Sequence, residues 1–371
     1  MTSDPSASIA IGKHPCPECG GDLEWNAARQ ALVCPYCGTV APWSPPAAAD
    51  LGDRIAENDL LAALKDPASG QRWSEEKIEV QCQSCRAISV FVGTRVAQRC
   101  DFCGSPAIVP HAAQGDAITP ASLLPFKISD GQVRDAIRKW YGTRWFAPNK
   151  LRRAALTDIL HGIYLPYWTF DAHVDAQWTA DAGHYYYVTE TYTQNGQSRT
   201  RQVRKVRWVP ASGQLAHFFD DELIPATTGV HAALLRQVEP FPTTTDLKPY
   251  SPEFVRGWTV ERYQVDLRRA AELNLAEMQA ATRQLCAAQV PGDTQRNLEV
   301  RSQYSGRTFK HILVPVWLVS YTYGSRNFQI LANGHTGEIA GERPWSWVKI
   351  TLTVLAVLAL LLLYFGLGTS E

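Results

Sequence analysis

Cys16-Pro-Glu-Cys19 and Cys34-Pro-Tyr-Cys37 are the first half of the pattern that decides the fold of this chain. The second half, Cys82-Gln-Ser-Cys85 and Cys100-Asp-Phe-Cys103, repeats the same spacing of two, fourteen and two residues. Two residues between paired cysteines form a tight knuckle, and the fourteen between pairs allow a hairpin that returns the second knuckle to the first. Four thiolates then surround one point, which is the ligand set of a closed structural zinc site. The sequence predicts two structural zinc ions, with the ligands Cys16, Cys19, Cys34 and Cys37, and Cys82, Cys85, Cys100 and Cys103.

The surroundings of the cysteines favour metal over disulfide bonds. Gly20, Gly38 and Gly104 follow three of the four knuckles, where a residue free to adopt positive φ lets the chain turn around the metal. Disulfides need an oxidising compartment, and residues 1–13 contain neither the basic stretch nor the apolar core of a signal peptide. The ninth cysteine, Cys286, lies on the apolar side of a predicted helix and is expected to be a buried thiol.

Residues 350–367 form an apolar run of eighteen residues without a charged side chain. As a helix the run is about 27 Å long, which is close to the thickness of a bilayer core. Trp345 and Trp347 border it as interfacial rings would, and Arg343 and Lys349 lie on its N-terminal side. The positive-inside rule then predicts a single-pass protein of the inner membrane, tail-anchored, with its N-terminal domains in the cytoplasm.

The charges cancel overall but are unevenly distributed. The 371 residues carry 36 Lys and Arg against 36 Asp and Glu. Residues 50–79 contain eight acids and four cations, and residues 127–153 contain eight cations and two acids. A third segment, residues 199–207, has five cations and no acid. The chain is therefore acidic near its start and basic in its middle.

The expected fold class is multidomain α+β, with two N-terminal zinc ribbons, a duplicated strand–helix–strand module, a β-rich insertion and a C-terminal transmembrane helix. The predicted segments are a first zinc ribbon (1–44), an acidic helical linker (45–77), a second zinc ribbon (78–112), α+β module one (113–180), the β-rich insertion (181–260), α+β module two (261–344) and the membrane anchor (345–371).

The duplication rests on two segments with the same order of elements. In module one a strand over 123–128 leads into a helix with a capping box at Ser129 and Gln132, and then to Pro166-Tyr-Trp168. In module two a strand over 263–267 leads into a helix capped by Asp266, and then to Pro315-Val-Trp317. Because proline cannot donate to a strand ladder, each proline is expected at a sheet edge or a bulge.

A hairpin is predicted in the insertion. Residues 185–193 and 199–209 alternate with period two on either side of the turn residues Asn195-Gly196.

Several stretches resemble a widespread bacterial family of membrane-anchored zinc-ribbon proteins of undetermined function. The matching stretches include Leu124-Pro-Phe-Lys-Ile-Ser, Gly162-Ile-Tyr-Leu-Pro-Tyr-Trp-Thr-Phe-Asp, His217-Phe-Phe-Asp-Asp, Phe309-Lys-His-Ile-Leu-Val-Pro-Val-Trp and Asn333-Gly-His-Thr-Gly. Members are often described as transcription factor IIB type zinc ribbons or as relatives of primosomal protein N-prime (replication factor Y), a helicase. The resemblance implies zinc and a membrane anchor. The chain contains no G-x-x-x-x-G-K-[ST] phosphate loop, so helicase activity is not implied.

Charge separates the binding hypotheses. The first ribbon has Arg29 against Glu18, Asp22 and Glu24, and a zinc with four thiolates adds two negative charges, so the ribbons lack the basic surface that phosphate contact requires. They are better suited to protein contact. The basic segment 127–153 has three interpretations, which are a solvated helix face, an anionic membrane surface and nucleic acid.

Enzyme signals are weak. His173, Asp175, Asp181, His184, His217, Asp220, Asp221 and Glu222 have residue types found in hydrolytic metal sites, but in no known ligand spacing. The leading hypothesis is therefore a non-enzymatic, membrane-anchored adaptor or assembly factor that binds a protein partner. The alternatives are a membrane-tethered nucleic-acid-binding protein linked to replication or transcription and, with least support, a hydrolase.

Overall fold

The structure is a computed structural model of the whole chain. It describes residues 15–41, 55, 57–66, 77–92, 99–111, 117–146, 148, 160–195, 197–323 and 326–368. Within these residues it contains helices and strands, two N-terminal clusters of four cysteines and a large β-rich body, as the sequence predicts.

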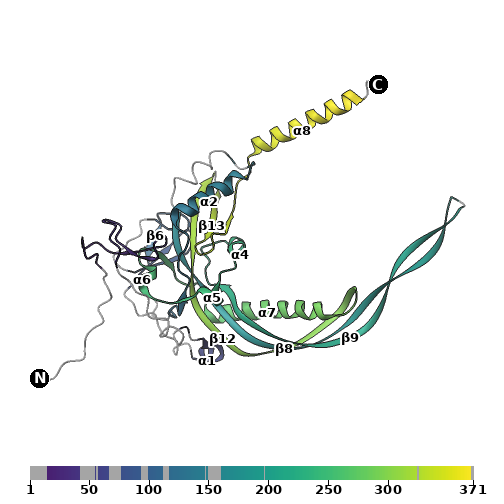
Figure 1. Cartoon of the computed structure of the whole chain (residues 1–371), viewed down its shortest axis with the longest axis horizontal. Coiled ribbons are helices and arrows are strands. Elements are labelled where there is room, and N and C mark those ends of the chain that lie inside the picture. The colour runs from purple at the N-terminus through teal and green to yellow at the C-terminus, as the bar shows by residue number, and fades with distance from the viewer. Residues whose placement is uncertain are drawn as a thin grey trace.

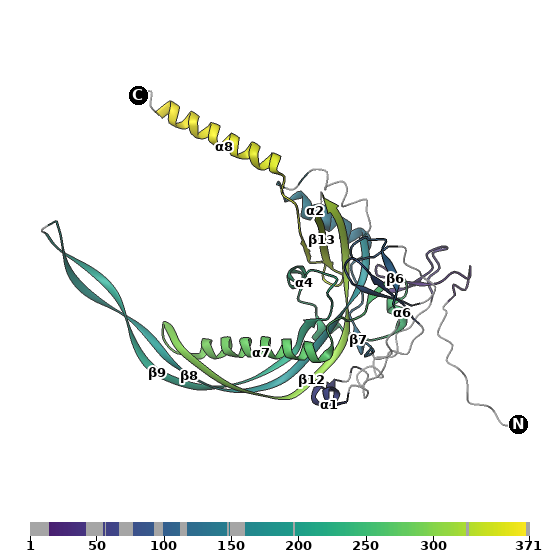
Figure 2. The ribbon, with the colours of Figure 1, turned by 180° about the vertical axis from the view of Figure 1, so that it is seen from behind.

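Two long antiparallel strands organise the molecule. β8 (Leu160–Gln194) pairs with β12 (Thr294–Tyr323) from Leu160, opposite Val319, to Gly183, opposite Thr294. From Phe170 to Ala180, side chains of β8 alternate between buried and exposed over much of the stretch, as a sheet with one covered face requires. Figures 1 and 2 show that these strands leave the body as a curved sheet, with helix α7 (Leu267–Gln289) along its concave side.

The predicted hairpin forms, but it is longer than its sequence signal. β8 pairs with β9 (Gln197–Pro225) from Tyr167, opposite Pro225, to Gln194, opposite Gln197. The strand that contains Pro166-Tyr-Trp168 thus continues without interruption into the predicted insertion. The prediction located only the outer part of the hairpin, next to its turn residues.

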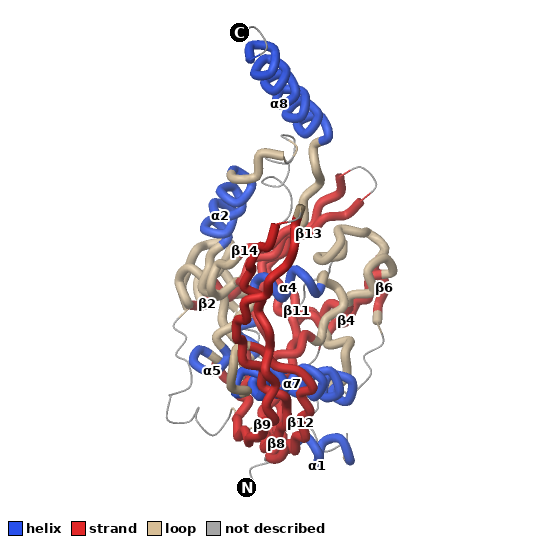
Figure 3. The backbone as a smooth tube through the Cα atoms, turned by 90° about the vertical axis from the view of Figure 1, so that its right-hand side faces the viewer, coloured by secondary structure: helices blue, strands red, loops and turns tan. Residues whose placement is uncertain are grey.

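The body is built on a sheet whose strands come from distant parts of the sequence. Its order is β10-β7-β12-β8-β11-β5-β4-β6, with β9 beside β8 and with β3 and β13 beside β12. The bounds of the remaining strands are β3 Asn58–Asp59, β4 Lys77–Cys82, β5 Ile88–Val92, β6 Ile108–Pro110, β7 Ser122–Leu123, β10 Lys248–Pro249, β11 Thr259–Glu261, β13 Arg326–Asn333 and β14 Ile339–Gly341. A separate hairpin consists of β1 (Glu24–Asn26) and β2 (Ala31–Val33). Figure 3 shows the sheet with α2 (Asp130–Gly142) near one side.

The prediction that the two prolines lie at an edge or a bulge is wrong, because both lie inside paired strands. Pro166 is opposite Leu313, and Pro315 is opposite Tyr164. On its other side β8 pairs with β11 up to Tyr164 and with β9 from Tyr167, so Pro166 lies where the neighbouring strand changes. Pro315 lies at the equivalent change on β12, between β7 and β13. Each proline, which has no N–H group, therefore lies where its strand has, among the described residues, no paired residue on the side away from the β8–β12 pairing.

The two predicted helix caps are confirmed. Ser129 and Gln132 form the capping box of α2, and the Asp266 side chain accepts from Arg269 N at the start of α7. The strands expected before these helices lie a few residues earlier, as β7 and β11, and residues 263–266 are an irregular segment. The other helices of the body are α1 Leu60–Lys65, α4 Ala232–Val238, α5 Thr243–Asp246 and α6 Pro252–Val255.

Aromatic rings pack against one another in the core of the body. Phe126 stacks on Trp258 at a centroid distance of 4.2 Å and contacts Trp317 edge-on at 5.1 Å. The face of Trp258 lies against the backbone of Gly162, where an added Cβ would be 1.9 Å from the ring. The sequence therefore needs a glycine at this position for the close approach of ring and backbone.

The predicted membrane span falls on helix α8 (Trp347–Gly368), which extends away from the body (Figure 1). Among the residues that the structure describes, no helix has the length and apolarity required to cross a membrane. The structure thus gives the predicted transmembrane helix no support.

Candidate metal centres

The four predicted ligands of the first site come together. Their sulfur atoms all lie within 4.8 Å of one another, with Cys16 Sγ 3.4 Å from Cys37 Sγ and Cys19 Sγ 3.5 Å from Cys34 Sγ. Four sulfurs at about 2.3 Å from a central zinc would be about 3.8 Å apart in a tetrahedron, whereas a disulfide bond is about 2.0 Å long. All four are free thiols, so this spacing fits a metal ion.

The second site has the same construction. Cys82 Sγ lies 3.6 Å from Cys103 Sγ, Cys85 Sγ lies 3.6 Å from Cys100 Sγ, and all four sulfurs are within 4.8 Å of one another. In both sites the first cysteine is close to the fourth and the second to the third. The eight sequence-predicted ligands therefore form two centres that could each hold one metal ion.

A left-handed residue closes each knuckle. Gly20, Gly38 and Gly104 have φ between 72° and 76°, and their N–H groups donate to the carbonyl oxygens of the first cysteines of their knuckles. The fourth knuckle has Arg86 in this position, with φ of 63° and its N–H 2.9 Å from Cys82 O. A residue with a Cβ atom is sterically disfavoured at positive φ. The same turn therefore forms at Arg86 although its φ is unfavourable for a non-glycine residue.

The thiols are electrostatically unequal. Hydrogen bonding from Thr39 lowers the pKa of Cys37 to about 6. Burial opposes the ionisation of Cys82, yet the backbone amides of Cys85 and Ser84 lower its pKa to about 7, while burial raises the pKa of Cys103 to about 11. Some thiols thus ionise readily while their neighbours retain protons. A cation bound among them would favour the thiolate form of all four.

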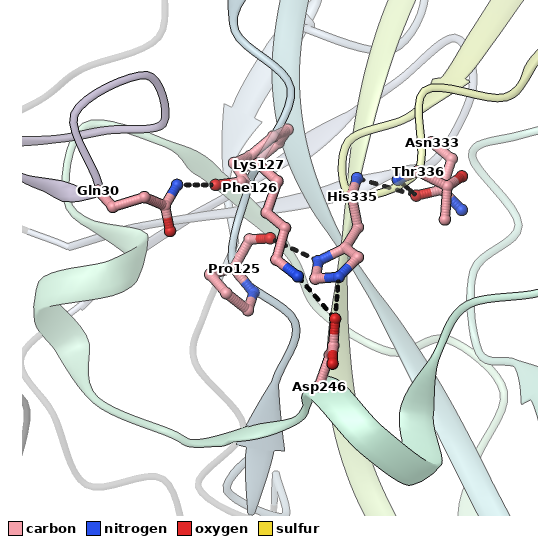
Figure 4. A network of polar contacts seen from close by, with 8 residues as sticks. All are labelled: Gln30, Pro125, Phe126, Lys127, Asp246, Asn333, His335 and Thr336. Carbon is pink, nitrogen blue, oxygen red and sulfur yellow. Dashed lines mark hydrogen bonds and ion pairs between the residues drawn. The ribbon is translucent and has the colours of Figure 1, made fainter.

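The first site is attached to the body through its hairpin. Trp25 is buried, contacts Phe254 edge-on at 4.8 Å, and accepts from Trp258 Nε1 at its carbonyl oxygen at 3.2 Å. Gln30 Nε2 donates to Phe126 O at 2.6 Å, as Figure 4 shows. The hairpin is therefore held against Phe126, Phe254 and Trp258.

The second site is integrated into the main sheet. β5, between its two knuckles, pairs with β11. Phe102, between Cys100 and Cys103, is fully buried, and its carbonyl oxygen accepts from Ser320 Oγ and from Gln329 Nε2. The neighbouring Asp101 accepts from Thr259 Oγ1. This knuckle is part of the core, whereas the first site is joined to the body by a hairpin.

A polar network that the sequence did not reveal surrounds Asp246 (Figure 4). Asp246 of α5 accepts from Lys127 Nζ at 2.6 Å and lies 2.8 Å from His335 Nε2. The other ring nitrogen of His335 lies 3.0 Å from Pro125 O. The sequence signal was the stretch Asn333-Gly-His-Thr-Gly, which reads as a turn. The network joins the segment before α2, helix α5 and the turn after β13.

A second group that was missed lies in the bend of the long sheet. Lys310 Nζ is 2.8 Å from Asp221 Oδ1 and 3.3 Å from Glu57 Oε1. Thr308 Oγ1 lies 2.8 Å from Glu57 Oε2 and 2.9 Å from Asp171 Oδ2, and its single hydroxyl proton can be donated to one of them at a time. Asp221 N donates to Asp171 Oδ1 at 2.7 Å. Both ladders of β8 shift register beside this group, which places it at a bulge.

The basic segment is partly neutralised by its own neighbours. Arg134 pairs with Asp130 at 2.5 Å and Arg138 with Asp135 at 2.6 Å, and Lys127 pairs with Asp246 as described above. Lys150, Arg152 and Arg153 lie outside the described residues. The described part of this segment is therefore less suited to phosphate contact than its count of cations indicates.

The residues considered for a hydrolase are dispersed along β8 and β9. The rings of His173 and Phe218 are 4.5 Å apart, Asp181 accepts from Arg296 and Asn297, and Asp221 pairs with Lys310. Within the described part of the chain, the groups of three or more His, Cys, Asp or Glu residues able to hold a metal are the two cysteine sets. Cys286 is buried in α7, as predicted.

Comparison with known proteins adds one similar sequence. The chain is 24% identical over 349 residues to the uncharacterised protein YdjG of Bacillus subtilis, and the match covers 92% of both chains. No family model matches the chain, and no solved structure matches it. The similarity therefore extends over nearly the whole architecture.

Proposed function

We propose that this chain is a zinc-ribbon adaptor that binds a protein partner through its first ribbon. The observation that carries the proposal is Tyr36, between the ligands Cys34 and Cys37, whose side chain is 81% exposed. Val40, just after this knuckle, is 46% exposed. Exposed aromatic rings on a rigid support are typical anchors of protein interfaces, and the metal and the Trp25 packing provide that support.

Zinc is the proposed ion at both centres. Four thiolates in tetrahedral spacing are a preferred ligand set for zinc, and they leave no open coordination position for substrate or water. The role that fits this arrangement is structural. When bound, the ion holds the two knuckles of each ribbon together, while Tyr36 of the first ribbon presents its ring to solvent.

Charge supports a protein partner over nucleic acid for this ribbon. Glu18, Asp22 and Glu24 outnumber Arg29 within residues 15–41, and the metallated thiolates add further negative charge. Phosphate groups would be repelled by this surface. The nucleic-acid alternative retains the cations of other segments as its candidates, but Arg134 and Arg138 of α2 pair with acids of the same helix.

Membrane attachment through α8 is the second part of the proposal. The described side chains of this helix include Leu352, Leu355 and Leu358, each at least half exposed. At its base, Arg343 lies over the ring of Trp345, and Lys349 Nζ donates to Trp145 O at 2.8 Å. Apolar surface of this extent beside rings and cations is characteristic of interfacial contacts. We propose the cytoplasmic face of the inner membrane as the location.

The adaptor role can be tested by affinity capture from nuclease-treated extracts. Tyr36→Ala should abolish capture of a specific protein partner and should retain two metal ions per chain. The matched control is Phe218→Ala, which removes a ring that is 45% exposed on β9, far from the cysteines in sequence. Capture that disappears on nuclease treatment, or that is identical for wild type and Tyr36→Ala, would contradict the proposal.

The attachment can be tested separately by fractionation. Removal of residues 345–371 should release the protein from membranes. If the truncated chain stays bound at both low and high salt, α8 is not the attachment site.

A further inference from the structure

The outer part of the β8–β9 hairpin has no third strand. β12 leaves β8 at Gly183, and the residues beyond, 184–194 of β8 and 197–207 of β9, pair only with each other among the described residues. We call these residues the arm. Figures 1 and 2 show it extending past the end of α7. Isolated two-stranded ribbons are marginally stable in water, so the arm is a surface that a partner would stabilise.

The arm has a cationic face. Strand alternation places Arg199, Arg201, Lys205 and Arg207 of β9 on the same face, with Val203 at their centre. An acidic partner already fits this face within the chain, because Glu190 lies 3.4 Å from Arg201 and 3.1 Å from Lys205. The face can therefore pair with carboxylates, and Val203 is an apolar position among the cations.

The hydrogen-bonding edge of β9 can be assigned from one contact. Tyr185 N donates to Asp293 Oδ2 at 2.7 Å, so its N–H group points away from β9. In an antiparallel ladder the backbone N–H and C=O groups of the residue directly opposite, Val206, must also point away from the partner strand. The same holds for the backbone groups of every second residue before it on β9. The outward N–H and C=O groups thus belong to Ser198, Thr200, Gln202, Arg204 and Val206. Within the described residues β9 pairs with no strand except β8.

We propose that the outer edge of β9, from Ser198 to Val206, binds an extended acidic segment of a partner protein as an additional β-strand. The main chain of the partner would pair with the outward groups, and its side chains would lie opposite the cationic face. Register then predicts acids at four alternate positions, opposite Arg199, Arg201, Lys205 and Arg207, with an apolar residue in the middle opposite Val203. This pattern is symmetric, so parallel and antiparallel segments both satisfy it.

The inference rests on the proposed adaptor function, for which it specifies the chemistry of a partner, but it uses a different surface from Tyr36. A nucleic-acid duplex could contact the same cations through its phosphates. It would not need the backbone edge of β9. The edge and the cations can therefore be perturbed independently.

The probe is a fluorescently labelled peptide, Glu-Thr-Glu-Thr-Val-Thr-Glu-Thr-Glu, titrated with the full-length protein. A peptide of the same composition with its four glutamates contiguous is the control ligand. Gln202→Pro removes one outward N–H group and leaves the β8–β9 ladder intact, because proline is tolerated where the N–H faces solvent. Thr189→Pro is the matched control. Thr189 lies on β8 directly opposite Gln202, and its backbone N–H group points away from β9, on the other edge of the hairpin.

Gln202→Pro should weaken binding by about tenfold or more, and Thr189→Pro should change it by less than about twofold. Simultaneous Arg199→Gln, Arg201→Gln, Lys205→Gln and Arg207→Gln should also weaken it by about tenfold or more. Tyr36→Ala should leave peptide binding unchanged, so failure of the ribbon proposal and failure of this one remain distinguishable.

Three outcomes would overturn the inference. One is equal binding of the contiguous-glutamate peptide. Another is tighter binding of a DNA duplex that the charge substitutions abolish and Gln202→Pro does not affect. The third is a dimer, measured by sedimentation, that Gln202→Pro dissociates, since the occupant of the edge would then be a second copy of the chain.

Discussion

Replacing Asp171 by asparagine should stabilise the protein at neutral pH. Asp171 is 2% exposed and lies beside Glu57, which shares its partner Thr308. Burial raises the pKa of Asp171 to about 6, whereas hydrogen bonds from Asp171 and Thr308 lower the pKa of Glu57 despite its partial burial. Asparagine keeps an oxygen for the Asp221 amide and supplies an N–H group that can donate to Glu57. It removes the buried negative charge that this environment disfavours.

The expected magnitude follows from the pKa of Asp171. The difference between about 6 in the folded protein and the ordinary value of 3.8 corresponds to about 3 kcal/mol. Because the folded state holds the proton more tightly than the unfolded state, the ionised carboxylate destabilises the fold above pH 6. That penalty declines as the pH falls through 6 and is absent below 3.8. The gain from Asp171→Asn should therefore be up to about 3 kcal/mol at pH 7 and close to zero at pH 3.5.

Urea unfolding of both proteins, followed by tryptophan fluorescence between pH 3.5 and 7.5, measures this difference. The matched control is Asp181→Asn, which changes a partly exposed aspartate on the same strand. A difference between wild type and Asp171→Asn that is independent of pH, or a loss of stability at pH 7, would refute the reasoning. The first result would mean that the pKa of Asp171 does not change on folding, and the second that its charge is needed beside Lys310.

Three other predictions follow from particular contacts. The full chain should contain two zinc ions by elemental analysis, and loss of one structural zinc should remove on the order of 10 kcal/mol of folding free energy. Cys100→Ser should perturb hydrogen exchange in β5 and β11, whereas Cys16→Ser should perturb it only in the first hairpin. Equal effects of the two substitutions would contradict the assignment of the second site to the main sheet. Gly162→Ala should cost at least about 1–3 kcal/mol in thermal or urea unfolding because its Cβ would overlap Trp258, while Gly131→Ala, with open space around it, should be neutral or slightly stabilising. Ser129→Ala should cost about 1 kcal/mol through loss of the α2 cap, and Ser129→Asn should restore most of it.

The sequence by itself determined the features that depend on short spacings. The caps at Ser129 and Asp266 and the hairpin turn between Gln194 and Gln197 follow from residues three or four positions apart, and each cysteine set lies within 22 consecutive residues. In each case the chemistry is local, because a thiolate knuckle, a capping side chain or a tight turn needs only its immediate neighbours. Propensity and periodicity therefore identify such features.

Only the tertiary structure decided which distant segments are neighbours. Pro166 and Pro315 look like edge residues in the sequence, but each lies where its strand exchanges one neighbour for another. Lys127 counts as a free cation in the sequence, yet it pairs with Asp246, 119 residues away. Asp171, Asp221 and Lys310 become one charged group because three long strands bend together. The physical reason is that burial and electrostatic partners depend on strand order, and the periodicity of a single strand carries no information about its neighbour.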